Sequence, residues 1–184
     1  MRHARVIVIN GVGSVGKTST ARELQKITAA PFLNIAMDQF LEMAPARLFG
    51  AADGLLFEAG EDEGLPSMAI STGPIFERLL TGMRHGIAAM AEHGNNIIVD
   101  DVFWNGEDKE YRRLLAAYDA RLVGLFAPLE LIEQRERSRG DRAIGLARWQ
   151  FGRVHQGVAY DLKIDMSEAT PFEAAVIIRD AFGL

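Results

Sequence analysis

The chain has 184 residues, 48% of them hydrophobic, which fits one globular domain with a single core and argues against a second full domain. Its net charge of −5 argues against a nucleic-acid partner, because surfaces that bind nucleic acid carry a basic face. The absence of cysteine excludes disulfides, thiolate metal sites and cysteine nucleophiles.

The first predicted element is a strand at residues 6–9, where the run Val-Ile-Val-Ile is ended by Asn10 and Gly11. An unbroken β-branched run of this length is typical of a strand buried on both faces in a parallel sheet. It is too short for the core of a signal peptide or for a membrane span. We therefore expect a cytoplasmic protein with no membrane partner.

Strands and helices alternate along the rest of the chain. Further buried strands are predicted at residues 32–36, 97–99, 122–126 and 162–164. Helices with apolar residues three and four positions apart are predicted at residues 18–28, 73–93, 108–118 and 172–182. This alternation predicts βαβ units, and so an α/β fold: an open, mostly parallel sheet of about five strands with helices on both faces.

Residues 46–71 show no clear element. The segment is rich in glycine and acidic residues, has weak periodicity, and is too long for a simple connection in a compact domain. Two interpretations stay open, a flexible insertion and a loop that covers the substrate, since long loops in compact enzymes often serve as lids.

Residues 11–18, Gly-Val-Gly-Ser-Val-Gly-Lys-Thr, match the phosphate-binding pattern G-x-x-x-x-G-K-[ST] between the first strand and the first helix. Glycines let backbone N–H groups converge on phosphate oxygens, and the helix N-terminus adds positive potential. We expect Lys17 to reach the β- and γ-phosphates of ATP and the Thr18 hydroxyl to ligate Mg²⁺. The predicted nucleotide contacts in this loop are Gly11, Val12, Gly13, Ser14, Val15, Gly16, Lys17, Thr18 and Ser19.

Asp38 follows the predicted strand at 32–36 and therefore lies at the ligand side of the sheet. It is our candidate for the base that accepts the proton of an attacking hydroxyl. N-capping of a helix at 39–43 is an equal alternative. The glycines of residues 11–16 also fit the dinucleotide pattern G-x-G-x-x-G, for which Asp38 would be the acidic residue about twenty positions on, but Lys17 weighs against that interpretation.

Asp100 and Asp101 close the predicted strand at 97–99. An apolar strand that ends in acids is the pattern of a Walker-B strand, whose carboxylate supports Mg²⁺ directly or through water. Both residues are candidate metal ligands, and we expect one of the two only to cap the following turn.

An arginine-rich segment at residues 133–148 is the predicted lid. Its alternating charges favour a solvated, salt-bridged helix surface, above all for Arg137. The helix should break near residues 138–141 and leave a basic turn that can neutralise charge on a triphosphate. Arg135, Arg139 and Arg142 are the candidates for that role.

Four segments together resemble the chloramphenicol phosphotransferase family, a branch of the P-loop kinases with a three-layer architecture. They are residues 9–18, 37–42, 97–103, and 139–142 with their continuation at 154–161. The resemblance implies Asp38 as the general base, Lys17 and Thr18 as contacts to ATP and Mg²⁺, and Arg135 and Arg139 as lid contacts. His155 and Tyr160 are implied as structural or pocket elements, and no second histidine stands at metal-ligand spacing from His155, so we predict no zinc site.

The expected function is an ATP-dependent O-phosphotransferase that acts on a hydroxyl of a small molecule, with antibiotic modification as one implied role. Residues 49–68, where an acceptor pocket would be completed, carry the least family pattern, so the acceptor stays open. A nucleotide-sugar kinase resembling zeta toxins is the first alternative, and an NTP-dependent switch without an acceptor is the second. A homo-oligomer is compatible with the sequence.

Overall fold

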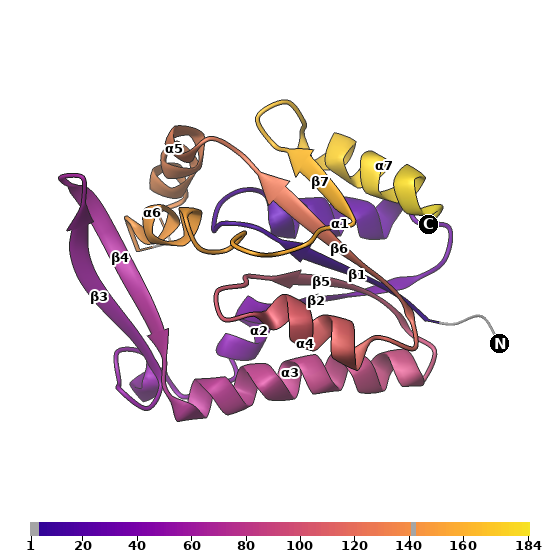
Figure 1. Ribbon diagram of the computed structural model, residues 1–184, viewed down its shortest axis with the longest axis horizontal. Helices are drawn as coiled ribbons and strands as arrows, with labels where there is room; N and C mark the ends of the chain where they lie inside the picture. The colour runs from indigo at the N-terminus through magenta and orange to yellow at the C-terminus, as the bar shows by residue number, and fades with distance from the viewer. Residues whose placement is uncertain (1–3, 141–142) are drawn as a thin grey trace.

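The computed structural model describes residues 4–140 and 143–184 of the chain. Figure 1 shows a central sheet with helices on both faces and a hairpin that stands away from the sheet at one end. In chain order the elements are β1 (Arg5–Asn10), α1 (Lys17–Ile27), β2 (Phe32–Ala36), α2 (Met37–Leu41), the 3-10 turn η1 (Ala46–Leu48), β3 (Leu55–Asp62), β4 (Leu65–Thr72), α3 (Pro74–Glu92), β5 (Asn96–Asp101), α4 (Glu107–Leu114), β6 (Asp119–Phe126), α5 (Leu129–Arg139), α6 (Leu146–Phe151), β7 (Leu162–Asp165) and α7 (Pro171–Phe182).

Five strands form one parallel sheet in the order β2-β5-β1-β6-β7. β1 is the central strand, and its Val8 lies opposite Val99 of β5 and Leu122 of β6. Helices cover both faces, so β1 is buried from Val6 to Asn10, and for that reason its sequence is an unbroken apolar run. The predicted α/β fold with a mostly parallel sheet of about five strands is confirmed.

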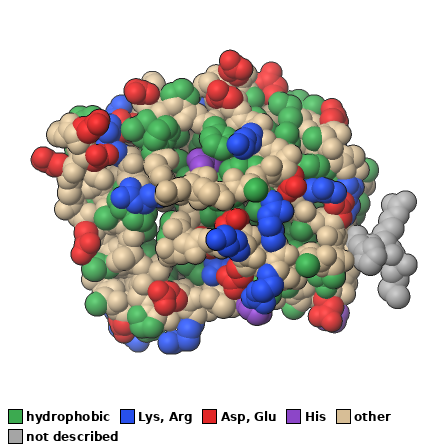
Figure 2. Space-filling view, viewed as in Figure 1, with side chains coloured by type: hydrophobic (Ala, Val, Ile, Leu, Met, Phe, Trp, Pro, Cys, Tyr) green, Lys and Arg blue, Asp and Glu red, His purple; other side chains and the backbone are tan. Residues whose placement is uncertain are grey.

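Two pairs of helices form the outer layers. α1 packs against α7, and α3 packs against α4; Figure 1 shows the two pairs on opposite faces of the sheet. Within the described residues, no helix is long and apolar enough to cross a membrane. On the face shown in Figure 2, Lys and Arg side chains lie beside Asp and Glu side chains. Between α3 and α4, Arg84 and Glu110 form an ion pair.

The helix predicted at 108–118 is shorter than expected, because α4 ends at Leu114. The chain then turns, with Tyr118 N donating to Leu115 O (2.9 Å), and Asp119 N donates to Ala4 O (3.2 Å). The turn is needed to bring Asp119 into register with Arg5 at the start of the pairing of β1 with β6.

Residues 46–71, in which the sequence showed no clear element, contain regular secondary structure. After η1 the chain forms the antiparallel hairpin β3–β4, closed by a two-residue turn in which Glu63 (φ 52°) and Gly64 (φ 74°) both have positive φ, as the commonest tight hairpin turn requires. The two strands were not predicted from the sequence because acidic residues lie near the tip and apolar and polar residues alternate only in part. β3 and β4 form a sheet of their own, separate from the main sheet.

α5 breaks where the sequence predicted, since it ends at Arg139 and Gly140 takes the left-handed conformation (φ 69°). The helix α6 that follows was not predicted. α6 connects the hairpin to α5: Met68 N of β4 donates to Gly145 O (3.0 Å), and Arg148 of α6 pairs with Glu133 of α5 (2.8 Å).

Asn10, the last residue of β1, joins three parts of the chain through the hydrogen bonds of its side chain. Its side chain is 0% exposed. Nδ2 donates to Val154 O (2.7 Å) and to the Tyr160 hydroxyl (2.5 Å), and Oδ1 accepts from Phe103 N (2.9 Å). One buried amide thus fixes the segment after β5 and the segment after α6 to the strand that precedes the phosphate-binding loop.

We expect Asn10→Ala to lower the free energy of unfolding by about 2–3 kcal/mol, because it leaves a buried N–H and a buried carbonyl without partners. Asn34→Ala is the matched control, since its buried Oδ1 has no hydrogen-bond partner among the described residues and its loss should cost far less. Urea denaturation followed by circular dichroism measures both changes. Equal losses in the two variants would contradict the role given to Asn10.

Candidate active site

The loop between β1 and α1 encloses the ammonium group of Lys17. Lys17 Nζ donates to Gly11 O (2.8 Å) and to Val12 O (3.2 Å). A Cβ atom at Gly11 would lie 2.8 Å from Leu125 O of β6, so only glycine fits where the loop leaves the sheet. Gly16, at φ 116°, precedes α1 in a conformation that other residues rarely adopt. The loop has the tight form that a phosphate cradle needs.

Asp100 of β5 lies beside the start of α1. The Thr18 hydroxyl donates to Asp100 Oδ2 (2.6 Å), and Lys17 Nζ lies 3.9 Å from Asp100 Oδ1. A hydroxyl and a carboxylate at one point fit Mg²⁺, which takes oxygen ligands and keeps part of its coordination sphere for water and phosphate. The described residues contain no group of three or more His, Cys, Asp or Glu that could hold a metal alone, so phosphate oxygens would have to complete such a site.

Asp101 lies on the opposite face of β5, as the alternation of a strand requires. Its side chain is 1% exposed and accepts from Val102 N (2.8 Å) and from the Tyr111 hydroxyl (2.7 Å). Burial raises the pKa of Asp101 to about 7, although both hydrogen bonds act against the rise. The structure brings Asp100 to the loop and leaves Asp101 capping the turn after β5.

A cavity of about 500 Å³ opens on one side of the loop, between α1 and α5. Residues 14–19 form its floor, and Arg135 and Arg139 are among its walls. Arg135 spans the cavity edge, with Nη1 donating to Val15 O (3.2 Å) and Nη2 to Met166 O (3.1 Å). Arg142 lies outside the described residues.

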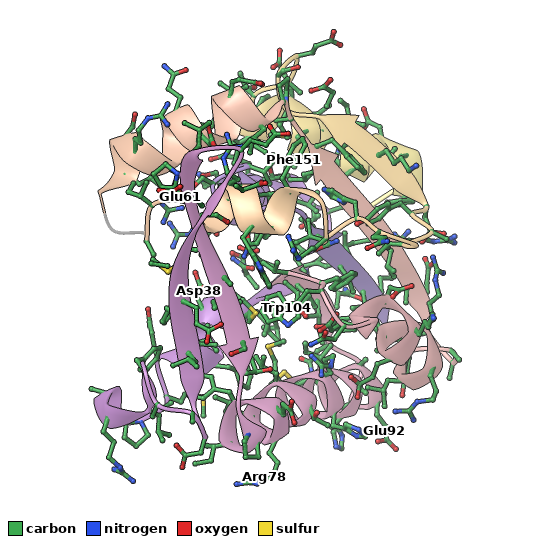
Figure 3. The ribbon with its side chains drawn as sticks, turned by 60° about the vertical axis from the view of Figure 1, so that its left-hand side comes forward. Asp38, Glu61, Arg78, Glu92, Trp104 and Phe151 are labelled. Carbon is green, nitrogen blue, oxygen red and sulfur yellow. The ribbon has the colours of Figure 1, made fainter. Side chains whose placement is uncertain are left out.

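A second cavity of about 230 Å³ lies on the other side of the loop, under the hairpin. Its polar lining includes Asp38, Asp100 and Gln150. Most of the remaining lining is apolar: Met37, Leu41, Phe49, Leu55, Phe57, Ile70, Leu80, Val102, Trp104, Ala143 and Leu146. Figure 3 shows Asp38 and Trp104 in the region between the hairpin and the sheet. Ser14 and Lys17 line both cavities, so the two meet at the loop.

Asp38 lies within the first turn of α2, and Ala36 occupies the N-cap position. The alternative that Asp38 caps this helix is therefore wrong. Its carboxylate is among the groups that line the cavity under the hairpin, near the carboxyl end of β2.

His155 packs inside the protein and lines neither of these two cavities. Its ring stacks on Phe126 with 3.9 Å between centroids, and its Nδ1 lies 2.7 Å from the Tyr160 hydroxyl. Burial, helped by the charge of Lys17, lowers the pKa of His155 to about 4, so the ring is neutral near pH 7. Of the two roles implied for His155, structural or pocket element, this geometry fits the structural one.

Sequence reasoning missed Gln150, Trp104 and the apolar wall that the hairpin supplies. Gln150 Oε1 accepts from Gly13 N of the loop (2.7 Å), although 137 positions separate the two residues. α6 is only six residues long, which is too short for a periodic signal. Glycine and acidic content dominated the hairpin segment, so its inward apolar residues had no recognisable pattern.

The parallel sheet, the phosphate-binding loop after its central strand and the cavities on both sides of that loop define a P-loop phosphotransferase. The chain belongs to the chloramphenicol phosphotransferase-like family, whose sequence pattern it matches over residues 4–183. The resemblance drawn from the four segments is thereby confirmed.

Known proteins similar to this chain agree with that class. A protein of Mycobacterium tuberculosis H37Rv, named "Putative O-phosphotransferase", is 27% identical over 188 residues, covering 99% of this chain and 84% of that protein. The M. tuberculosis APS kinase, solved with AMPPNP and APS, is similar in fold with a TM-score of 0.69 and 14% identity over the whole of both chains. A gluconokinase of Sinorhizobium meliloti has a TM-score of 0.65 and 16% identity over 100% of this chain and 92% of that one.

The raised pKa of Asp101 predicts how stability changes with pH. Between pH 4 and 7 the folded chain holds a proton on Asp101 that the unfolded chain has released, so stability should fall as the pH rises, by at most about 1.4 kcal/mol per pH unit. Asp101→Asn should remove this component, and the exposed Asp53→Asn should not. Urea unfolding at pH 5 and pH 7.5 tests it, and a wild-type pH dependence that Asp101→Asn leaves intact would refute the assignment.

Proposed function

We propose that this protein transfers the γ-phosphoryl group of ATP, bound with Mg²⁺, to a hydroxyl group of a small molecule. One observation carries the proposal: the two cavities meet at Ser14 and Lys17 of the phosphate-binding loop, with arginines in one and a carboxylate, Asp38, in the other. If ATP occupies one cavity and the molecule to be phosphorylated occupies the other, the two would come together only at that junction.

The larger cavity is the proposed ATP site. The loop amides would hold the phosphates, and Lys17 would exchange its bonds to Gly11 and Val12 for bonds to phosphate oxygens. Thr18 and Asp100 would hold Mg²⁺, which neutralises phosphate charge when it is bound. Arg135 and Arg139 are among the lining residues, fall within the lid expected at 133–148, and would stabilise charge that grows during transfer.

The smaller cavity is the proposed acceptor site, and Asp38 is its base. The acceptor oxygen would attack the γ-phosphorus while its proton passes to the Asp38 carboxylate. The bond between the γ-phosphorus and the bridging oxygen would break, and ADP would leave with that oxygen. The β3–β4 hairpin would then act as the substrate cover expected for residues 46–71.

The lining of the smaller cavity favours a neutral acceptor with an apolar or aromatic body. Phe49, Phe57 and Trp104 supply aromatic surface, and Lys17 is the only cation among the described lining residues. Because Lys17 serves the phosphates of ATP, the described part of the lining has no other positive charge for an anionic acceptor. Hydroxylated antibiotics are the first acceptors to test, with sugars and other alcohols as comparison.

Asp38→Asn should lower phosphoryl transfer by about 10²–10⁴-fold, because the variant cannot accept the hydroxyl proton. Glu42→Gln, at an exposed position at the end of the same helix, should retain wild-type transfer. The measurement is acceptor-dependent ATP consumption, with calorimetry of an Mg²⁺–ATP analogue as the binding control. The assignment of the base fails if Asp38→Asn transfers at the wild-type rate, and the proposed function fails if the wild-type chain binds no nucleotide.

Arg135→Met should slow transfer by about 10²-fold, because it removes a preorganised charge from the transition state. Arg137→Met is the matched control, since Arg137 lies two positions along α5, is exposed, and lines neither cavity. Steady-state rates at saturating ATP measure the effect. If the two variants behave alike, Arg135 has no special part in transfer.

A further inference from the structure

Gln150 connects the phosphate-binding loop to the proposed acceptor cavity. Its side chain is 4% exposed, and its Oε1 accepts from Gly13 N at 2.7 Å. Gly13 permits this close approach, because a Cβ atom there would lie 3.2 Å from the same oxygen. Gln150 and Gly13 both line the cavity that holds Asp38.

The contact with Gly13 fixes which way the carboxamide of Gln150 points. A backbone N–H can meet only the oxygen of the amide, so the NH₂ group lies on the other side. Among the hydrogen bonds of the described residues, none uses Gln150 Nε2 as a donor. Nε2 is not among the buried polar atoms that lack a partner, so it opens on the cavity, where an oxygen of water or of a ligand can accept from it.

The backbone around Gln150 is held from both ends, so the carboxamide cannot easily move away. Gln150 O accepts from Val154 N (3.0 Å), and Val154 O in turn accepts from Asn10 Nδ2 (2.7 Å). At the other end of α6, the buried carboxylate of Glu136 accepts from Gly145 N (2.9 Å) and Ala147 N (2.8 Å). The backbone that carries the Gln150 side chain is therefore held in place by hydrogen bonds that lead to β1 and α5.

We propose that Gln150 is the residue that sets the position of the acceptor: Oε1 holds Gly13 while Nε2 donates a hydrogen bond to an oxygen of the acceptor molecule. The inference rests on the proposed acceptor role of the smaller cavity. It adds that the acceptor must carry an oxygen able to accept a hydrogen bond as well as a hydroxyl to be phosphorylated. A single rigid amide then sets the distance between the acceptor and the loop that holds the phosphates.

Binding of two small aromatic probes tests this inference without any phosphoryl transfer. Acetophenone carries a carbonyl oxygen that can only accept, and ethylbenzene has a methylene group in its place. NMR titration of the ¹⁵N-labelled chain gives the Kd of each probe and follows the side-chain NH₂ of Gln150. The titrations are run on the wild type, Gln150→Met, Gln150→Glu and the control Gln156→Met, which alters an exposed glutamine outside the cavity.

The wild type should prefer acetophenone to ethylbenzene, and the Gln150 NH₂ resonances should shift with acetophenone alone. Gln150→Met should reduce that preference about five- to tenfold, the value of one hydrogen bond, whereas Gln156→Met should leave it unchanged. In Gln150→Glu the Gly13 amide resonance should stay near its wild-type position, because an oxygen still accepts from it, while the preference is lost. The Gln150→Glu variant removes the NH₂ donor but keeps an oxygen that accepts from Gly13, and it shows that the loop is intact.

The inference is overturned if neither probe binds in the cavity, if Gln150→Met keeps the wild-type preference, or if Gln156→Met loses it equally. Because no ATP takes part, these results are independent of the kinase assay. A chain that phosphorylates an alcohol but shows no preference for the ketone would retain the proposed function and lose this role of Gln150.

Discussion

The whole site depends on how closely the chain passes the sheet where it leaves β1. At Gly11 a side chain would collide with the carbonyl of Leu125 in the neighbouring strand, so the loop can turn back only through glycine. The tight turn points the loop carbonyls at Lys17 and brings the start of α1 against Asp100. The cation, the hydroxyl of Thr18 and the carboxylate are thus positioned by one steric constraint on the backbone.

The same turn divides the surroundings of the loop into two spaces with different chemistry. On the α5 side, arginines and the hydroxyls of Thr18 and Ser19 suit a highly charged ligand. On the hairpin side, aromatic and aliphatic side chains surround two carboxylates, Asp38 and Asp100, next to the loop. Asn10 and Gln150 connect the loop to the segments that enclose these spaces, so the two cavities keep a fixed relation to each other.

The main sheet and the loop could be predicted from the sequence because their signals are local. A parallel strand covered on both faces must be apolar at every position, as residues 6–9 are, and a phosphate-binding loop needs glycine and lysine at fixed spacing. The contacts made by Gln150 and Asn10 could not be predicted, because they join residues between 93 and 150 positions apart. For Asp100 and Asp101 the sequence supplied two equal candidates. Their opposite directions follow from the pleat, but only the packing of α1 against one face shows which carboxylate meets the loop.

The hairpin β3–β4 makes its ladder of hydrogen bonds within itself, and none of its strands belongs to the parallel sheet. Phe57 and Ile70 on its side toward the cavity therefore lie outside the sheet that carries the phosphate-binding loop, whereas Leu55 packs with Leu48 and Phe76 in a small second core. If the proposed acceptor site is correct, substitutions in the hairpin would change selectivity for the acceptor while the parallel sheet and its loop stay the same. A family with this architecture can change which molecules it recognises through substitutions within about twenty residues, those of the β3–β4 hairpin.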